Sequence, residues 1–348
     1  MLYTGRTRGQ TAELCLRPKR SSRVQKIVAK NQSIQVGPLR ESELEEAGRI
    51  VRLAFGTFLG LPNPLEFMGD RDFLTPRWRS RNAVVLAARQ QGRLLGSNVV
   101  SRWGSFGFFG PLTVLPDFWG SGIAQRLLSS TMKVFARWGV RHSALFTFAG
   151  SPKHVGLYQK FGYWPGSLTA LMKRAPQTPA GSLLPGVKPP ALLSTLSDGE
   201  KRQAIAACAK LANGIERGLD LSEEIRAVLK QRIGDVPLVY GQRSLEAFAV
   251  CMNGGGSEGG AKTCYVKFAM ARGGAGGSKR FERLLDAVDA LALARGAEVE
   301  AGVSLSCEDA FRRMHTRGYR MTTLGVAMQH PRGEGFNRPG NYVLGDWR

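Results

Sequence analysis

The sequence contains no run of about 18 consecutive apolar residues, so no membrane-spanning helix is expected. Histidine is scarce, with four in 348 residues, and none of the five cysteines forms a Cys-x-x-Cys pair. No spacing typical of metal ligands is therefore present. An odd number of cysteines is typical of free thiols in a reducing compartment.

Acidic residues are few beside basic ones, 27 against 49, which gives a net charge of +22. The excess is +7 in residues 1–32, +10 in 33–175 and +5 in 176–348, so it is spread along the chain. A nucleic-acid-binding protein usually concentrates basic residues in a stripe interleaved with aromatics. We therefore expect an anionic small molecule, such as a phosphorylated cofactor, and neither nucleic acid nor a membrane as partner.

The length predicts two domains, at about 150 residues each. Residues 1–32 are basic and lack the apolar core of a secretory signal, which leaves a disordered basic tail, an early start codon or an organelle transit peptide. We expect a cytoplasmic protein, or one of an organelle matrix if 1–32 are a transit peptide. The predicted division is 1–32 tail, 33–175 N-terminal domain, 176–190 proline-rich linker, 191–330 C-terminal domain and 331–348 C-terminal tail. Three aromatics in that last tail predict that it docks on the body.

Apolar periodicity and turn residues predict the same order of elements in both halves. Expected strands in the first half are Ile34–Pro38, Ala83–Arg89, Leu94–Trp103, Phe106–Leu115, Ala144–Phe148 and Tyr163–Lys173. Its expected helices are one capped by Ser42, one from Ile123 to Trp138 and one opened by Ser151-Pro152, with 56–81 irregular. Expected strands in the second half are Leu192–Leu196, Leu238–Gly241, Leu245–Met252, Cys264–Ala271, Val299–Leu305 and Tyr319–Gln329. Its expected helices are Asp198–Arg217, Ser222–Arg232, Phe281–Ala292 and Glu308–Arg317.

The two halves also overlay weakly as sequences. Arg126-Leu127-Leu128 matches Arg283-Leu284-Leu285, and Gly139 matches Gly296. The overlay indicates an internal duplication.

The segment from Leu112 to Ala124 is the most informative, because it runs from a strand through a glycine turn into a helix. Small residues let the backbone approach a ligand, and the first amides of the helix are unpaired donors at its positive end. This combination suits a pyrophosphate. Gly-x-Gly alone also fits an ordinary turn, and neither a Rossmann fingerprint nor a nucleotide P-loop is present.

The run Trp119-Gly120-Ser121-Gly122-Ile123-Ala124 resembles motif A of the GNAT superfamily of N-acyltransferases, with Trp119 where the family has Gln or Arg. Ser151 to Tyr163 resembles the family's motif B. The resemblance covers about residues 34–174 closely and the second half faintly. It implies an α/β (α+β) GNAT fold, a mixed central sheet flanked by helices, in two tandem GNAT-like domains with a degenerate C-terminal one.

The resemblance implies acetyl-CoA as co-substrate and a set of residues that bind it. These are Leu112, Val114, Trp119, Gly120, Ser121, Gly122, Ile123, Ala124, Ser151 and Tyr158. Tyr158 is the candidate proton donor to the leaving thiolate, or a core aromatic that only binds the cofactor. His154, one turn earlier, is the candidate base, with an exposed surface role as the alternative. The other candidates for a base are Glu66, Asp70, Asp72 or a water chain.

The implied function is transfer of an acetyl group from acetyl-CoA to a primary amine by direct attack. The alternative is a non-catalytic acyl-CoA sensor or pseudoenzyme. In the overlay Gly122 meets Lys279 and Tyr158 meets Met314, so we expect the second half to be structural or to form one wall of the acceptor site. Gly273–Gly277 remains a second anion-site candidate if the overlay slips. The sequence is compatible with a homodimer.

Overall fold

The computed structural model describes residues 33–177 and 189–347. The predicted tail 1–32 and most of the predicted linker 176–190 lie outside the described residues, so neither prediction is tested. No described helix is long and apolar enough to cross a bilayer.

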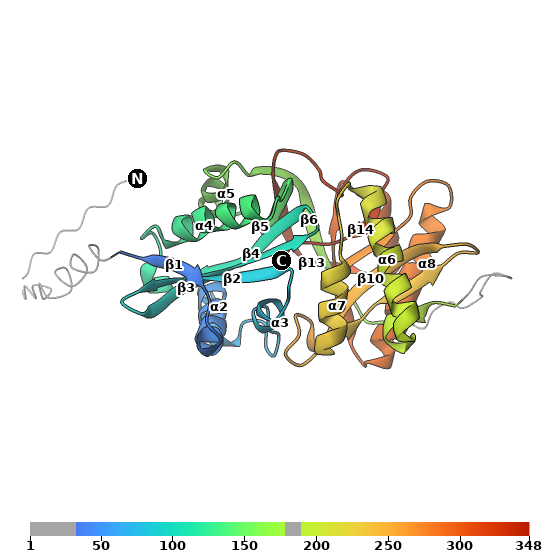
Figure 1. Cartoon of the computed structure of the whole chain (residues 1–348), viewed down its shortest axis with the longest axis horizontal. Helices are drawn as coiled ribbons and strands as arrows, with labels where there is room; N and C mark the ends of the chain where they lie inside the picture. Colours follow the sequence, from blue (N-terminus) through green and yellow to red (C-terminus); the bar gives the residue numbers. More distant parts are fainter. Residues whose placement is uncertain (1–32, 178–188, 348) are drawn as a thin grey trace, which may run out of the picture. The chain divides into compact units, whose positions relative to one another are not determined.

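The first half follows the predicted order of elements. Its strands are β1 (Gln35–Pro38), β2 (Ala83–Gln90), β3 (Arg93–Trp103), β4 (Phe106–Val114), β5 (His142–Phe148) and β6 (Trp164–Arg174). Its helices are α2 (Leu44–Phe58), α3 (Thr75–Trp78), α4 (Ile123–Arg137) and α5 (Pro152–Gln159), with short 3-10 helices η2 (Glu41–Glu43), η3 (Pro64–Glu66) and η4 (Pro116–Phe118). Helices α4 and α5 lie on one face of this part of the sheet and α2 on the other (Figure 1).

The second half repeats this order and adds two short strands, β8 and β14. Its strands are β7 (Ala191–Leu192), β8 (Gly234–Asp235), β9 (Pro237–Tyr240), β10 (Leu245–Gly254), β11 (Gly260–Ala271), β12 (Glu298–Ser304), β13 (Arg320–His330) and β14 (Tyr342–Leu344). Its helices are α6 (Asp198–Ile215), α7 (Ser222–Gln231), α8 (Gly277–Ala294) and α9 (Glu308–Thr316), with the 3-10 helix η5 (Leu193–Thr195). The docking predicted for the C-terminal tail is confirmed, because β14 joins the sheet and Phe336 and Trp347 are buried.

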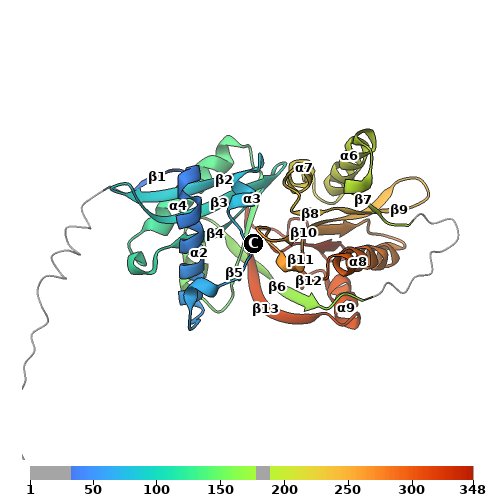
Figure 2. The ribbon, with the colours of Figure 1, turned by 90° about the horizontal axis from the view of Figure 1, so that it is seen from below.

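The described strands form one mixed sheet in the order β1-β2-β3-β4-β5-β13-β6-β12-β11-β10-β9-β7, with β14 beside β11 and β8 beside β10. This order confirms the predicted mixed central sheet flanked by helices. It is nearly symmetric about its centre, since the parallel pair β4–β5 corresponds to the parallel pair β11–β12. The last strand of each half crosses into the other half: β13 pairs with β5, and β6 pairs with β12 (Figure 2). The two halves therefore share backbone hydrogen bonds at the centre of the sheet.

Strands β4 and β5 pair over only three residues of β4, Phe106 to Phe108. Beyond them β4 stays on β3, whereas β5 stays on β13. The register between β3 and β4 shifts between Phe109 and Leu112, which is a β-bulge. The two strands thus separate at their carboxyl ends.

Side chains of the second-half sheet alternate between two cores, as a strand buried on both faces requires. In β10, Phe248 and Val250 face the core beside α6 and α7, whereas Ala247 and Ala249 face the core beside α8. The first of these cores includes Trp103 of the first half, whose ring centroid lies 5.4 Å from that of Phe268. The two halves consequently share a hydrophobic core as well as a sheet.

Three details differ from the sequence-based expectations. Ser42 does not cap a helix: it lies inside η2, and Glu43 Oε2 accepts the bond from the Arg40 amide instead. Residues 56–81 contain η3 and α3. The strand expected at 192–196 is the short β7 followed by η5. In the last two cases a 3-10 or α turn stabilised by hydrogen bonds within a few residues replaces the extended or irregular backbone that the sequence pattern suggested.

A second connection between the halves is ionic and buried. Arg77 donates to both carboxylate oxygens of Glu258, at 2.8 and 2.6 Å, and Lys267 Nζ lies 2.7 Å from Glu258 Oε2. Burial opposes ionisation of Glu258, but the two cations outweigh it and lower its pKa to about 2. Since Arg77 belongs to α3 and its partners to the second half, this cluster stabilises the junction only while all three charges are present.

Glu258→Gln is expected to lower the free energy of unfolding by about 3–5 kcal/mol, because it leaves two buried cations without their carboxylate. Urea unfolding monitored by tryptophan fluorescence measures it. The control is Glu223→Gln, which breaks an exposed pair with Arg226 and should change the free energy by less than about 1 kcal/mol. Equal effects of the two substitutions would contradict a stabilising role for the cluster.

Candidate active site

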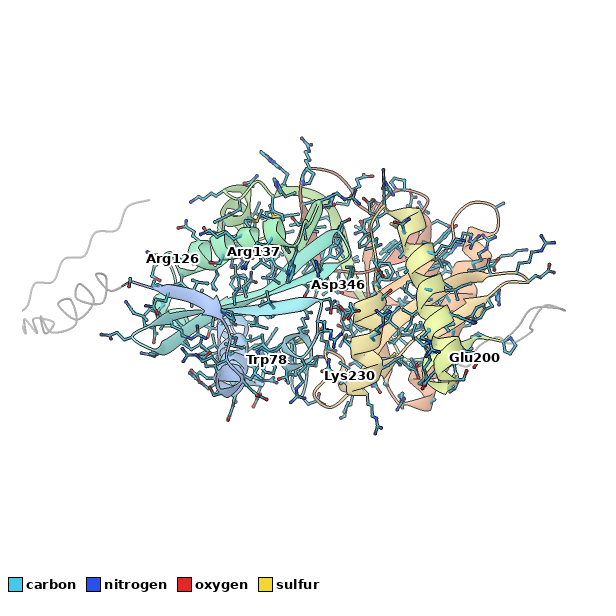
Figure 3. All side chains as sticks on the ribbon, in the orientation of Figure 1. Trp78, Arg126, Arg137, Glu200, Lys230 and Asp346 are labelled. Atoms are coloured by element: carbon cyan, nitrogen blue, oxygen red, sulfur yellow. The ribbon has the colours of Figure 1, made fainter. Side chains whose placement is uncertain are left out.

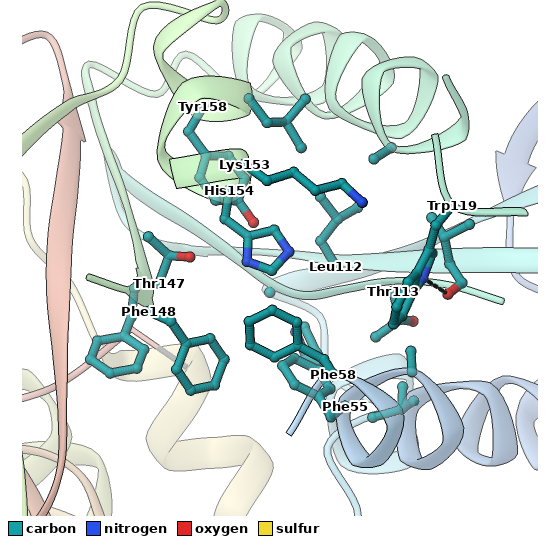
Figure 4. Close-up of a pocket in the computed structure, with 18 of the residues that line it drawn as sticks. Phe55, Phe58, Leu112, Thr113, Trp119, Thr147, Phe148, Lys153, His154 and Tyr158 are labelled. Carbon is teal, nitrogen blue, oxygen red and sulfur yellow. Dashed lines mark hydrogen bonds between the residues drawn. The ribbon is translucent and has the colours of Figure 1, made fainter. Parts of the chain in front are cut away.

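A cavity of about 800 Å³ opens where β4 and β5 separate. Its wall is strongly aromatic. Eight phenylalanines contribute to it: Phe55, Phe58, Phe67, Phe73, Phe109, Phe118, Phe146 and Phe148. Side chains from α5 point into the cavity from one side, and side chains from α2 point into it from the other side (Figure 4). Leu171, Thr323 and Trp347 also line it, so both exchanged strands, β6 and β13, and the C-terminal tail complete the wall.

The glycine turn before α4 presents a row of free amides to the cavity. Gly120 and Gly122 have φ angles of +82° and +84°, which favour glycine over residues with a Cβ. The amides of Gly120, Gly122, Ile123, Ala124 and Gln125 donate to no residue that the structure describes. They lie at the positive end of a 15-residue helix. Such an end binds anions, and phosphates in particular.

The edge of β4 provides two further donors. The Leu115 amide donates to Leu95 O on β3 at 2.8 Å. Because successive amides of a strand point to opposite edges, those of Leu112 and Val114 point away from β3, towards the gap. Strand β5 no longer pairs with β4 there. The Arg77 guanidinium, held by Glu258, donates to Gly110 O at 2.5 Å and so fixes the bulge that precedes these donors.

Trp119 lies at the turn, and its indole contacts the end of β4. Its ring nitrogen donates to Val114 O at 2.7 Å (dashed in Figure 4). The Lys153 ammonium lies 5.5 Å from the centroid of this ring, in cation–π contact. Lys153 therefore places a positive charge beside the side chain that occupies the family's Gln or Arg position.

His154 and Tyr158 both point into the cavity from α5 (Figure 4). Burial, and then the charge of Lys153, lower the pKa of His154, so its imidazole is neutral near pH 7. Burial raises the pKa of Tyr158, so its phenol keeps its proton. Neither side chain forms a hydrogen bond with another described residue. One neutral base and one protonated donor thus face the same space.

The structure brings most of the sequence-predicted site residues to this cavity. Those that line it are Leu112, Val114, Trp119, Gly120, Gly122, Ile123, Ala124, His154 and Tyr158. Ser121 and Ser151 do not: the Ser121 hydroxyl donates to Phe118 O at 2.6 Å, and Ser151 is buried at the start of α5. Sequence reasoning missed Phe55, Phe58 and Lys153. Lys153 lay within the quoted motif B, but only the fold shows it near Trp119.

The three acidic base candidates lie outside the cavity wall. Asp72 accepts hydrogen bonds from the amides of Leu74 and Thr75, and thereby begins α3. Asp70 accepts from the Ala261 amide at 2.8 Å. Glu66 accepts from the Asn63 side chain at 2.9 Å. Each of these carboxylates therefore accepts hydrogen bonds from nearby backbone or loop groups, away from the cavity.

The corresponding gap in the second half is filled. Strand β14 pairs with Ala269–Ala271, which are the overlay counterparts of Leu112–Val114. The Tyr342 ring packs against Gly277, where an added Cβ would lie 2.7 Å from a ring carbon. The overlay of Gly122 with Lys279 needs correction here: α8 starts at Gly277, three residues before the overlay counterpart of Ile123, so Gly276 precedes it as Gly122 precedes α4.

Comparison with known proteins identifies the family of the first half. Residues 57–163 match the model of the Acetyltransferase (GNAT) family. No curated protein matches the chain by sequence. Among solved structures, a proposed acetyltransferase from Pyrococcus horikoshii is similar with a TM-score of 0.64 and 14% identity, over 91% of this chain and 95% of that one. A GCN5-related N-acetyltransferase from Sphaerobacter thermophilus has a TM-score of 0.53 and 14% identity, over 88% and 96%.

A tandem GNAT protein from the clavulanic acid biosynthesis pathway has a TM-score of 0.55 and 10% identity, over 85% of this chain and 98% of that one. At 10–14% identity the structural likeness shows a shared fold. The family match covers residues of the first half. Residues 57–163 thus form a domain of the GNAT family of acetyltransferases, and the described chain has a tandem GNAT fold.

Proposed function

We propose that this protein transfers an acetyl group from acetyl-CoA to a primary amine in the cavity between β4 and β5. The observation that carries the proposal is the set of free amides of Gly120 and of Gly122 to Gln125, continued by the amides of Leu112 and Val114 along the same cavity. The amides at the start of α4 suit a pyrophosphate. The amides of Leu112 and Val114, at a strand edge, suit an extended arm that contains amide groups. In the second half β14 occupies the equivalent edge, which supports the view that this edge accepts extended chains.

The residues of the cavity have complementary roles in this proposal. The amine nitrogen attacks the thioester carbon, a C–N bond forms and the C–S bond breaks. His154 accepts the proton that the amine loses, and Tyr158 donates a proton to the departing sulfur. The Val114 amide donates to the carbonyl oxygen as negative charge develops there. Lys153 adds positive charge beside the phosphates.

Gly122→Glu is expected to weaken acetyl-CoA binding by about a hundredfold or more, because it places bulk and negative charge at the positive helix end. Calorimetry of the purified variants measures the affinity and the stoichiometry, which should be one cofactor per chain. Gly139→Glu is the matched control, since Gly139 also has a positive φ, +63°, but follows α4 away from the cavity. Equal affinity of wild type and Gly122→Glu would refute the site.

The pH dependence of kcat/KM should report His154. A base must be neutral, and its lowered pKa keeps it so down to below about pH 6.5, so the rate falls only at lower pH. Lys153→Met removes a charge that lowers this pKa and should move the fall to higher pH. Lys160→Met, a lysine of the same wall, should leave it in place. An unchanged profile in His154→Gln would exclude this residue as the base.

Tyr158→Phe is expected to lower kcat by about a hundredfold while the dissociation constant of acetyl-CoA stays nearly constant, because only proton donation is lost. The control is Tyr163→Phe, a buried tyrosine bonded to Ser143 outside the cavity. A parallel loss of cofactor affinity would instead assign Tyr158 to binding. Tight binding of acetyl-CoA, with no release of coenzyme A thiol in the presence of any amine, would identify an acyl-CoA sensor.

A further inference from the structure

We propose that the acceptor is an arylalkylamine, a primary amine on a short chain from an aromatic ring. This inference rests on the proposed function and names the substrate class of the same site. It assigns the ring of the acceptor to an aromatic wall that we define as Phe55, Phe58, Phe67 and Phe148. None of these four side chains has a part in the contacts attributed above to the cofactor.

The aromatic wall lines the same cavity as the amide row. Phe55 and Phe67 stack at 5.1 Å with an angle of 12° between their planes. Phe58, the last residue of α2, lies 5.1 Å from Phe148 of β5, measured between ring centroids. It is 38% exposed, so part of its face is free to receive another ring. Aromatic rings prefer such offset or edge contacts with one another.

The candidate base belongs to the same surface. The His154 ring lies 4.9 Å from the ring of Phe58 (Figure 4). An amine whose proton goes to His154 therefore has its substituent next to Phe58 and Phe148. A ring one or two carbon atoms behind the nitrogen reaches the aromatic wall, whereas a longer polar chain would have to cross it.

Charge separates this acceptor class from polycationic amines. In the part of the chain that the structure describes, no Asp or Glu lines the cavity, and Lys153 and Lys160 do. A polyamine, an aminoglycoside or a lysine in a basic peptide brings further ammonium groups, which would stay unpaired there at a high desolvation cost. The net charge of +22 also repels such acceptors. An arylalkylamine has one cation, and an apolar site favours its neutral, reactive form.

The test compares thiol release from saturating acetyl-CoA with 2-phenylethylamine and with spermidine. For the wild type, kcat/KM for 2-phenylethylamine should exceed that for spermidine by about tenfold or more. Phe58→Ala should lower the value for 2-phenylethylamine by about tenfold to a hundredfold, mainly through KM. Phe58→Glu should reverse the preference, because it supplies the missing carboxylate. Leu65→Ala, an exposed apolar residue outside the cavity, is the control and should change neither value.

Several outcomes would overturn the inference. One is a wild-type preference for spermidine, and another is equal behaviour of Phe58→Ala and Leu65→Ala. Faster turnover of hexanoyl-CoA than of acetyl-CoA with 2-phenylethylamine, abolished by Phe58→Ala, would assign the aromatic wall to the acyl chain. In these cases the proposed function stands, because acetyl or acyl transfer is still observed. Failure of the wild type to bind acetyl-CoA in calorimetry removes the proposed function itself, and the inference with it.

Discussion

The separation of β4 from β5 is the constraint on which the candidate site depends. Two parallel strands that part after three paired residues leave amides and carbonyls at both edges without strand partners. Backbone groups in a protein interior need hydrogen-bond partners, so the gap requires an occupant or water. In the first half it forms a cavity into which helix α4 points its free amides. A strand pair that stayed together would provide neither the space nor the donors.

The second half shows what happens when such a gap has an occupant from the same chain. Strand β14 supplies the backbone partners that Ala269–Ala271 need, and the Tyr342 ring covers the start of α8. The same tail then continues to Asp346, which accepts a bond from the Tyr265 hydroxyl at 2.8 Å (labelled in Figure 3), and to Trp347 in the wall of the first cavity. One tail therefore closes one gap and helps to shape the other.

Exchange of β6 and β13 makes the two halves depend on each other. Each half receives the strand next to its diverging pair from the other half, and the buried Arg77–Glu258–Lys267 cluster crosses the same junction. Arg77 also donates a hydrogen bond to Gly110 O in the bulge of β4. Because Glu258 of the second half positions Arg77, the second half helps to fix this bulge. The second half thus supports the site structurally, although its own gap is filled.

The sequence by itself determined the order of elements, the glycine turn and the helix that follows it. These features arise from residues close along the chain: apolar residues at helical spacing from Ile123 to Phe135, and glycines where φ is positive. Only the tertiary structure decided that β6 and β13 change places, that β14 fills the second gap and that Lys153 lies beside Trp119. It also turned Asp70 and Asp72 towards backbone amides and left His154 as the cavity's base candidate. Strand partners and the surroundings of a charge depend on packing between distant segments, and local periodicity carries no information about that packing.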